Sequence, residues 1–324
     1  MNAEIPQPDE KVQPIRVLQR RDEFVEEARA VGVDDLVDFR AFYTRGPLLF
    51  GAVAGPEDGV PVVLLHGFPD FWLGWAPQIR ALVEAGARVI IPDQRGYNQS
   101  EKPPNIDDYR LPALGGDILD LLDAVGFEDA HLVGHDWGGA VSWWLAQHHP
   151  DRLRTVSILN CPHPRVLGKA LQFGDLRQML KSWYIALFQI PGLSEAVVRA
   201  GDYGFLKAAL AASTREAFSR RELELYTRAW DRQNAVRSML NWYRASARAT
   251  LQARQTSSTG SREPIRVPMQ IIWGENDAAL DASLVEPSAA LAEEVEIHWL
   301  PEAGHWVQRD SPREVNERLV EFIC

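Results

Sequence analysis

The segment Gly134-His135-Asp136-Trp137-Gly138 places an acidic side chain between two glycines. It follows a strand pattern at 131–133 and precedes a helical pattern at 140–149. This G-x-x-x-G spacing is typical of a nucleophile elbow, a strained strand-to-helix turn that exposes one side chain at the end of the strand. A carboxylate in that place can attack a carbon atom and form an ester that a second step cleaves. A simpler interpretation makes Asp136 the N-cap of the following helix.

A second acid and a histidine follow the elbow along the chain. Asp277 lies just after a strand pattern at 269–273, and Glu275 competes with it on spacing alone. His305 lies between a strand pattern at 295–300 and a final helical pattern. The order nucleophile, acid, histidine is that of the α/β-hydrolase triad. We therefore expect Asp277 to orient His305, which would act as a general base.

The loop His66-Gly67-Phe68-Pro69 follows a strand pattern at 62–65. A hydrolase of this architecture places there the loop whose backbone N–H helps to bind an oxyanion. We expect the N–H groups of Phe68 and Trp137 to form this oxyanion hole, with an ordinary strand-ending turn as the alternative. The histidines next to these motifs, His66 and His135, precede the elbow acid, and we expect them to make structural hydrogen bonds.

Short strand patterns alternate with longer helical patterns over most of the chain. The strand patterns are aliphatic runs at 62–65, 88–91, 131–133, 269–273 and 295–300. The stretch 111–125 instead carries apolar residues at helical spacing. This alternation predicts an α/β protein with a mostly parallel sheet flanked by helices. Together with the motifs above, it resembles the α/β-hydrolase fold. Ser311-Pro312-Arg313-Glu314 predicts the start of the final helix, with a capping-box serine and Pro at the first position.

The pattern changes in the middle of the chain. Residues 163–262 are rich in Ala, Leu, Arg and Glu and show helical but little strand periodicity, and they end in a polar segment at 255–261. We therefore expect a helical lid, or cap domain, over 163–262, inserted into a core formed by residues 31–162 and 263–324. Residues 1–30 would form an N-terminal arm that is helical over 21–30.

Composition excludes several classes of protein. The 324 residues are 46% hydrophobic and carry a formal charge of −11, which argues against a nucleic-acid partner. The two cysteines, Cys161 and Cys324, are too few for a disulfide framework or a Cys-based zinc cluster. The first residues lack the basic start and apolar stretch of a signal peptide, and apolar runs are far shorter than the roughly 20 residues that cross a bilayer. These features favour a cytoplasmic protein without a transmembrane segment.

Beyond these local patterns, the chain from about residue 35 onward resembles the epoxide hydrolases of the soluble, microbial type within the α/β-hydrolases. Fold-level similarity includes Pro92-Asp93-Gln94-Arg95-Gly96-Tyr97 and Asn160-Cys161-Pro162-His163-Pro164. Two segments are more specific and resemble the lid segments that carry ring-opening tyrosines, Ser182-Trp183-Tyr184 and Leu240-Asn241-Trp242-Tyr243-Arg244. One departure is Asn98, where the family pattern has Gly, and since Asn tolerates a left-handed backbone the loop need not change.

The resemblance implies a reaction. Asp136 would open a small lipophilic epoxide to give a covalent ester while Tyr184 and Tyr243 bind and protonate the ring oxygen. His305, oriented by Asp277, would then activate a water that hydrolyses the ester to a vicinal diol. Neither a metal nor an organic cofactor is required. The sequence does not indicate an oligomeric state.

An apolar substrate pocket between lid and core is also implied. We expect it to involve His66, Pro69, Trp183, Phe188 and Trp306, besides the tyrosines. Tyr184 lies on an apolar helical stripe with Leu176, Met179, Leu180 and Trp183, which must face something apolar. The alternative is that the two tyrosines are amphipathic core residues without a role in chemistry.

Three other functions compete with this hypothesis. A haloalkane or haloacid dehalogenase would use the same Asp-His-Asp triad, but it would need N–H donors for a leaving halide in place of two lid tyrosines. A ligand-binding protein on the hydrolase scaffold would need no chemistry, although such proteins often lose a triad member. A serine esterase or lipase is disfavoured because Asp136 occupies the place of the nucleophile.

Overall fold

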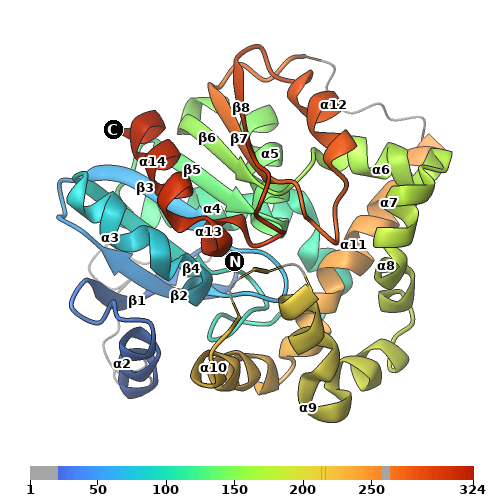
Figure 1. The fold of residues 1–324 in the computed structure, drawn as a ribbon, viewed down its shortest axis with the longest axis horizontal. Helices are drawn as coiled ribbons and strands as arrows, with labels where there is room; N and C mark the ends of the chain where they lie inside the picture. Colours follow the sequence, from blue (N-terminus) through green and yellow to red (C-terminus); the bar gives the residue numbers. More distant parts are fainter. Residues whose placement is uncertain (1–20, 213, 216, 257–262) are drawn as a thin grey trace, which may run out of the picture.

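A computed structural model describes residues 21–212, 214–215, 217–256 and 263–324 (Figure 1). Its centre is an eight-stranded sheet in the order β1-β2-β4-β3-β5-β6-β7-β8. Strand β2 pairs antiparallel with β1 and β4, and all other neighbours are parallel. The strands are β1 Val37–Tyr43, β2 Leu48–Ala54, β3 Val60–Leu65, β4 Ala87–Asp93, β5 Ala130–His135, β6 Leu153–Leu159, β7 Met269–Gly274 and β8 Val295–Leu300. The predicted fold class is confirmed.

The central strands explain why the sequence patterns were recognisable. Strands β5 and β7 are buried at every position, and so are residues 62–65 of β3. Parallel strands covered by helices on both faces need apolar side chains on both faces, which produces continuous aliphatic runs. All five predicted strands are present, and most extend by a residue or two beyond the aliphatic run.

Helices cover both faces of the sheet (Figure 1). On one face α3 (Ala76–Glu84) packs against α14 (Pro312–Ile323), and on the other α4 (Leu111–Val125) packs against α5 (Trp137–His148). Helix α4 has the predicted bounds, and it ends at Gly126, which adopts the left-handed backbone conformation that favours glycine (φ 80°). Within the described residues, no helix has both the length and the apolar content needed to cross a membrane.

Between β6 and β7 the described residues form six helices, and they are α6 Pro164–Phe173, α7 Leu176–Lys181, α8 Trp183–Phe188, α9 Leu193–Ala212, α10 Arg220–Asp231 and α11 Ala235–Thr256. Helix α9 is interrupted by non-helical backbone at Ala200–Tyr203. The expected helical character of this insertion agrees with the structure. Its boundaries as a lid domain, 163 and 262, stay a prediction, and the polar segment from 257 onward lies outside the described residues.

The start of the last helix corrects one expectation. Pro312 occupies the first position of α14 as predicted, but the Ser311 side chain makes no capping hydrogen bond. The reason is the short helix α13 (Val307–Asp310), which runs directly into α14, so the Ser311 N–H already bonds to the Val307 carbonyl at 3.0 Å. Glu314 pairs with Arg313 instead. The predicted capping box is therefore wrong.

Helix α2 (Arg21–Ala30) forms where the N-terminal arm is predicted to be helical, and residues 1–20 of that arm lie outside the described part. The helix attaches to the core through two side chains. Phe24 stacks on Phe39 of β1 with ring centroids 4.5 Å apart. Glu27 is buried and accepts a hydrogen bond from the Trp72 indole at 2.8 Å.

Asn98 adopts the left-handed backbone (φ 35°) that its position was expected to need. Its side chain does more than tolerate this conformation. The amide donates to buried Asp93 at 2.9 Å, and its carbonyl oxygen accepts from Arg232 at the end of α10 at 2.8 Å. Asn98 thus ties the core to the helical insertion, a contact that glycine could not make.

Candidate active site

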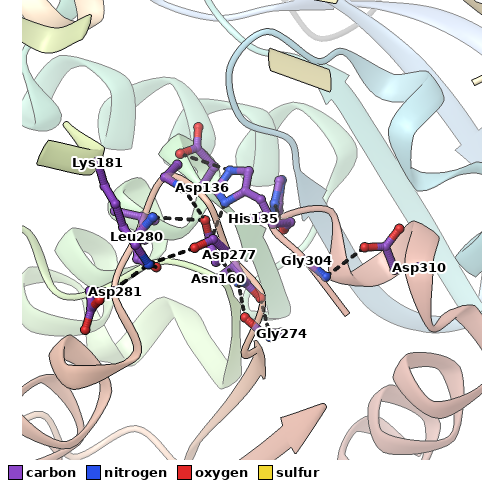
Figure 2. A network of polar contacts seen from close by, with 12 residues as sticks. His135, Asp136, Asn160, Lys181, Gly274, Asp277, Leu280, Asp281, Gly304 and Asp310 are labelled. Carbon is purple, nitrogen blue, oxygen red and sulfur yellow. Dashed lines mark hydrogen bonds and ion pairs between the residues drawn. The ribbon is translucent and has the colours of Figure 1, made fainter. Parts of the chain in front are cut away.

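Asp136 lies at the turn between β5 and α5 with φ 49° and ψ −120°, a strained backbone conformation. The turn is tight on both sides. A Cβ atom on Gly134 would overlap the carbonyl of Gly138, and one on Gly138 would overlap the carbonyl of Leu65. Asp136 does occupy the N-cap position of α5, but its side chain makes no capping hydrogen bond, so capping does not account for an acid at this place. Its carboxylate points into the site (Figure 2).

Two backbone N–H groups hold the Asp136 carboxylate. The Phe68 N–H donates to Oδ1 at 2.8 Å, and the Trp137 N–H also bonds to this carboxylate. The loop can approach this closely because Gly67 has no side chain, and a Cβ there would collide with the Asp136 carboxylate. The two N–H groups expected to form an oxyanion hole therefore converge on one place.

His305 and Asp277 form the rest of a triad. Nδ1 of His305 lies 2.8 Å from Oδ2 of Asp277, and Nε2 lies 3.7 Å from Oδ2 of Asp136. The other oxygen of Asp277 accepts from the backbone N–H groups of Ala279 and Leu280 at 2.7 and 2.9 Å. Asp277 is fully surrounded by these partners, whereas its sequence competitor Glu275 is exposed.

The electrostatics of the three groups are coupled. Burial raises the pKa of the Asp136 carboxyl, while the nearby imidazole and the two N–H donors oppose this shift. Burial alone would lower the pKa of His305, but the carboxylates of Asp277 and Asp136 outweigh it and raise that pKa to about 9. Burial alone would raise the pKa of Asp277, but the charge of His305 and its hydrogen bond outweigh this effect and keep that pKa below its usual range. Near neutral pH the imidazole is therefore charged and lies between two carboxylates.

Two further histidines support the site without facing it. His135 donates from Nε2 to the His305 carbonyl at 2.8 Å, and burial lowers its pKa to about 3, so it stays neutral. His66 accepts a bond from the Gln94 N–H at 3.0 Å, and burial lowers its pKa to about 4. Both make structural hydrogen bonds, as the sequence suggested.

Tyr184 of α8 and Tyr243 of α11 lie opposite the elbow. Their ring centroids are 5.9 Å apart, and the Tyr184 hydroxyl hydrogen-bonds to Tyr243. Tyr243 stands edge-on to the Trp137 ring with centroids 5.0 Å apart. Burial, and then the charge of Asp136 among other groups, raises the pKa of both phenols, which stay protonated and can donate.

Asp136, Trp137 and both tyrosines line one cavity of about 350 Å³. Most of its remaining wall is apolar and comes from α6, α8 and α11, through residues such as Leu167, Leu171, Ile185, Ala247 and Leu251. Sequence reasoning did not identify the α6 and C-terminal α11 residues. Their only signal was apolar spacing, which any packed helix has.

Five side chains assigned to this pocket do not line it. Trp183 is 59% exposed on the outside of the insertion, and Phe188 is fully buried behind the tyrosines, 5.0 Å from the Tyr243 ring. Pro69 is buried, and its carbonyl accepts a bond from the Trp230 indole. The buried His66 ring is held by its hydrogen bond from the Gln94 N–H. Trp306 packs edge-on against His305 and borders a separate cavity next to α2. The structure therefore does not bring these five predicted residues into the wall of the cavity that Asp136 lines.

Several residues that hold the triad acid were not assigned that role from sequence. Asn160 donates from its side-chain amide to Oδ2 of Asp277 at 2.8 Å. Lys181 of α7 donates to the Asp277 carbonyl at 2.8 Å and to the Leu280 carbonyl at 3.2 Å (Figure 2). Gln178, one turn earlier, bonds to the Ala279 carbonyl and accepts from the Asp281 N–H. The helical insertion is thus fastened to the acid loop.

Comparison with known proteins agrees with this geometry. A family model described as alpha/beta hydrolase fold matches residues 60–312. The chain therefore belongs to the α/β-hydrolase family. Over 281 residues it is 42% identical to the AB hydrolase superfamily protein YfhM of Bacillus subtilis, covering 86% of this chain and 96% of that protein.

Within that family, its place is among the epoxide hydrolases. It is 33% identical to Epoxide hydrolase 4 of Homo sapiens over 285 residues, covering 85% of this chain and 76% of the human protein. The crystal structure of Epoxide Hydrolase A from Mycobacterium thermoresistibile matches with a TM-score of 0.77 and 30% identity, covering 89% of this chain and 98% of the other. The chain is accordingly an enzyme of the hydrolase class.

Proposed function

We propose that this protein hydrolyses small lipophilic epoxides to vicinal diols through a covalent ester on Asp136. The observation that carries the proposal is one cavity with a carboxylate on one side and two protonated phenols on the other. Ring opening of an epoxide needs both at once, because a carbon is attacked while the ring oxygen becomes an alkoxide. The similarity to epoxide hydrolases supports the same substrate class.

In the first step, Oδ2 of Asp136 attacks one ring carbon, and the bond from that carbon to the ring oxygen breaks. Oδ1 is already held by the Phe68 N–H, so Oδ2 is the oxygen that faces the reaction. The electron pair passes to the ring oxygen, which Tyr184 or Tyr243 protonates. The product is a hydroxyalkyl ester of Asp136, and the phenol recovers its proton from the surrounding groups.

In the second step, His305 takes a proton from a water molecule that attacks the ester carbonyl carbon. The carbonyl oxygen is Oδ1, so negative charge develops where the Phe68 N–H already points, and the Trp137 N–H bonds to the same carboxyl group. Esterification also removes the charge of Asp136, one of the two carboxylates that raise the pKa of His305. The imidazole then loses its proton more readily and becomes a competent base. Collapse of the intermediate releases the diol and restores the Asp136 carboxylate.

A specific contact disfavours dehalogenation. A leaving halide needs N–H donors, yet the loop residue Phe68 has no side-chain N–H, and the Trp137 side chain is hydrogen-bonded to Tyr243. The intact triad geometry also argues against a protein that only binds ligands. Localisation in the cytoplasm stays a prediction from the sequence.

The test is to trap the intermediate. Removal of the base by His305→Gln should allow ester formation but slow its hydrolysis, so mixing with styrene oxide should add the mass of the epoxide to a peptide that contains Asp136. Asp136→Ala serves as the control and should acquire no adduct. An adduct on another residue would refute the mechanism. Release of bromide from 1-bromobutane, without diol formation from styrene oxide, would assign the chain to the dehalogenases.

A further inference from the structure

The outer side of the helical insertion carries an unusual row of exposed apolar side chains. Leu176, Met179 and Leu180 of α7 and Trp183 at the start of α8 follow each other at the spacing of one helical face. Leu176 is 73% exposed, Leu180 75% and Trp183 59%. The sequence predicted that this stripe must face something apolar. In the monomer it faces solvent, and contiguous apolar patches of this kind mark interaction sites.

The opposite side of α7 explains why the row points outward. Gln178 is fully buried, and with Lys181 it bonds to the loop of residues 277–281 that carries the triad acid. These polar contacts fix the rotation of the helix about its axis. The apolar residues therefore cannot turn inward without breaking hydrogen bonds next to Asp277. We call the four side chains Leu176, Met179, Leu180 and Trp183 the α7 face.

The charge of the chain is strongly segregated. Residues 163–262 contain sixteen Lys and Arg against seven Asp and Glu, a formal charge of +9, although the whole chain carries −11. The remaining residues therefore carry −20. Four cations of the insertion are exposed, namely Arg177 of α7 itself, Arg165 and Lys169 of α6, which packs against α7, and Arg248 of α11. No carboxylate in the described ranges lies within ion-pair distance of these four.

We propose that the α7 face and its surrounding cations bind the surface of an anionic lipid bilayer. A helix with exposed Leu and Trp beside unpaired Lys and Arg has the chemistry of an interfacial helix, in which the apolar side chains enter the headgroup region. Each cation near an anionic surface strengthens binding about fivefold. The acidic core does not prevent docking, because charges farther than about 8 Å are screened at physiological salt.

Charge also decides against a second copy of the chain as the occupant. A symmetric dimer through the α7 face would bring two cationic insertions together, with Arg177 of each copy near the other. An anionic bilayer instead complements both the apolar row and the positive charge. The bilayer surface is therefore the partner that fits both observations.

The position of the cavity gives the docking a consequence. Helices α6, α8 and α11 line the cavity, and α6 packs against α7 (Figure 1). Leu251 belongs to the cavity wall and is 56% exposed. Docking through the α7 face would bring these helices close to the bilayer. A lipophilic epoxide dissolved in the bilayer would then enter the cavity directly. This route of entry rests on the proposed function, whereas lipid binding by the α7 face is independent of it.

The test is co-sedimentation of the full chain with vesicles, measured without any epoxide. We expect binding to phosphatidylcholine vesicles that contain roughly a third phosphatidylglycerol, weak binding to pure phosphatidylcholine, and release at high salt. Leu176→Ser with Leu180→Ser should abolish binding, and Lys169→Gln with Arg177→Gln should weaken it about 25-fold. Arg313→Gln with Arg318→Gln on α14 changes the net charge equally and should bind like the wild type.

The substituted residues lie outside the cavity, so each variant should hydrolyse a water-dissolved epoxide at the wild-type rate. Unchanged turnover shows that the variant is folded. Three results would overturn the proposal. The wild type might fail to sediment with anionic vesicles, the Leu176→Ser, Leu180→Ser variant might bind equally well, or light scattering might reveal a dimer that this variant dissolves. Each would leave the proposed hydrolysis intact, because that reaction is measured separately.

Discussion

The Phe68 N–H donates to Oδ1 of Asp136 at 2.8 Å, so the oxyanion site already holds one oxygen of the attacking carboxylate. Oδ2, the other oxygen, lies 3.7 Å from Nε2 of His305. The two oxygens therefore have different environments before any substrate arrives. In the proposed mechanism Oδ2 becomes the bridging oxygen of the ester, and Oδ1 becomes its carbonyl oxygen. Water later attacks the carbonyl carbon and not the carbon of the substrate.

Isotope labelling tests this order of events. In water enriched in oxygen-18, a single turnover with enzyme in excess should give an unlabelled diol, since the new hydroxyl oxygen comes from Asp136. After many turnovers, the diol and the Asp136 carboxylate should both carry the label. Mass spectrometry of the diol and of the peptide measures the two quantities. Labelled diol in the first turnover, with an unlabelled protein, would indicate direct attack by water. An unlabelled protein without any diol would indicate a binder without chemistry.

Removal of either phenol should slow ring opening. We expect Tyr184→Phe and Tyr243→Phe each to lower the rate of ester formation about 100-fold, because the developing alkoxide loses one proton donor. Hydrolysis of the ester should change little, since it depends on His305. Rapid-quench kinetics separate the two steps. Tyr203→Phe is a matched control, because this lid tyrosine is buried but donates to Asp231, outside the cavity. Equal losses in all three variants would indicate a general effect on folding.

The sequence predicted the triad and the fold well for a physical reason. The elbow needs glycine where backbones nearly touch, and buried parallel strands need continuous aliphatic runs, so both leave local signals. Asp136 and Asp277 each follow such a strand, and His305 follows the half-exposed strand β8 at the edge of the sheet. Their relative placement is then a consequence of the sheet, whose strands end at a common edge.

The cavity wall could not be predicted in the same way. Trp183 and Tyr184 are neighbours in sequence and both belong to α8, where successive side chains point about 100° apart around the helix axis. Tyr184 consequently faces the cavity and Trp183 faces solvent. Leu171 and Leu251 approach each other only through packing of helices far apart in the chain. Such contacts have no local signature.

The pKa of about 9 for His305 makes a prediction about protons. At pH 7 the imidazole starts charged, and it should lose its proton when esterification removes the charge of Asp136. The proton that His305 loses replaces the one that the alkoxide gains, so ester formation at pH 7 should take up no proton from the solvent. Above the pKa of His305 the base starts neutral, and a full proton should be taken up for each ester. A pH indicator in weak buffer, read by stopped flow, measures this uptake at pH 7 and pH 10. Full uptake at pH 7 would show that His305 starts neutral.

Glu27 should make the stability of the fold depend on pH. Burial raises its pKa from 4.5 to about 7, the Trp72 hydrogen bond opposes this rise, and the charge of Asp93 adds to it. Between those values the folded state binds more protons than the unfolded state, so the stabilising effect of the neutral carboxyl is lost as pH increases from 4.5 to 7. Above pH 7 a charged carboxylate is held in the core.

Glu27→Gln removes this charge and keeps an oxygen that can accept from Trp72. We expect it to increase the free energy of unfolding at pH 8 by at most about 3 kcal/mol and to have little effect at pH 4.5. Denaturant unfolding at the two pH values measures the difference, which includes the loss of the repulsion between Glu27 and Asp93. The neighbouring Glu26→Gln is the control. Glu26 is half exposed, and its hydrogen bonds to Arg228 and Arg221 lower its pKa, so its removal should not stabilise the protein at pH 8. An effect of Glu27→Gln that is the same at both pH values would mean that the carboxyl is not neutral in the folded protein at low pH.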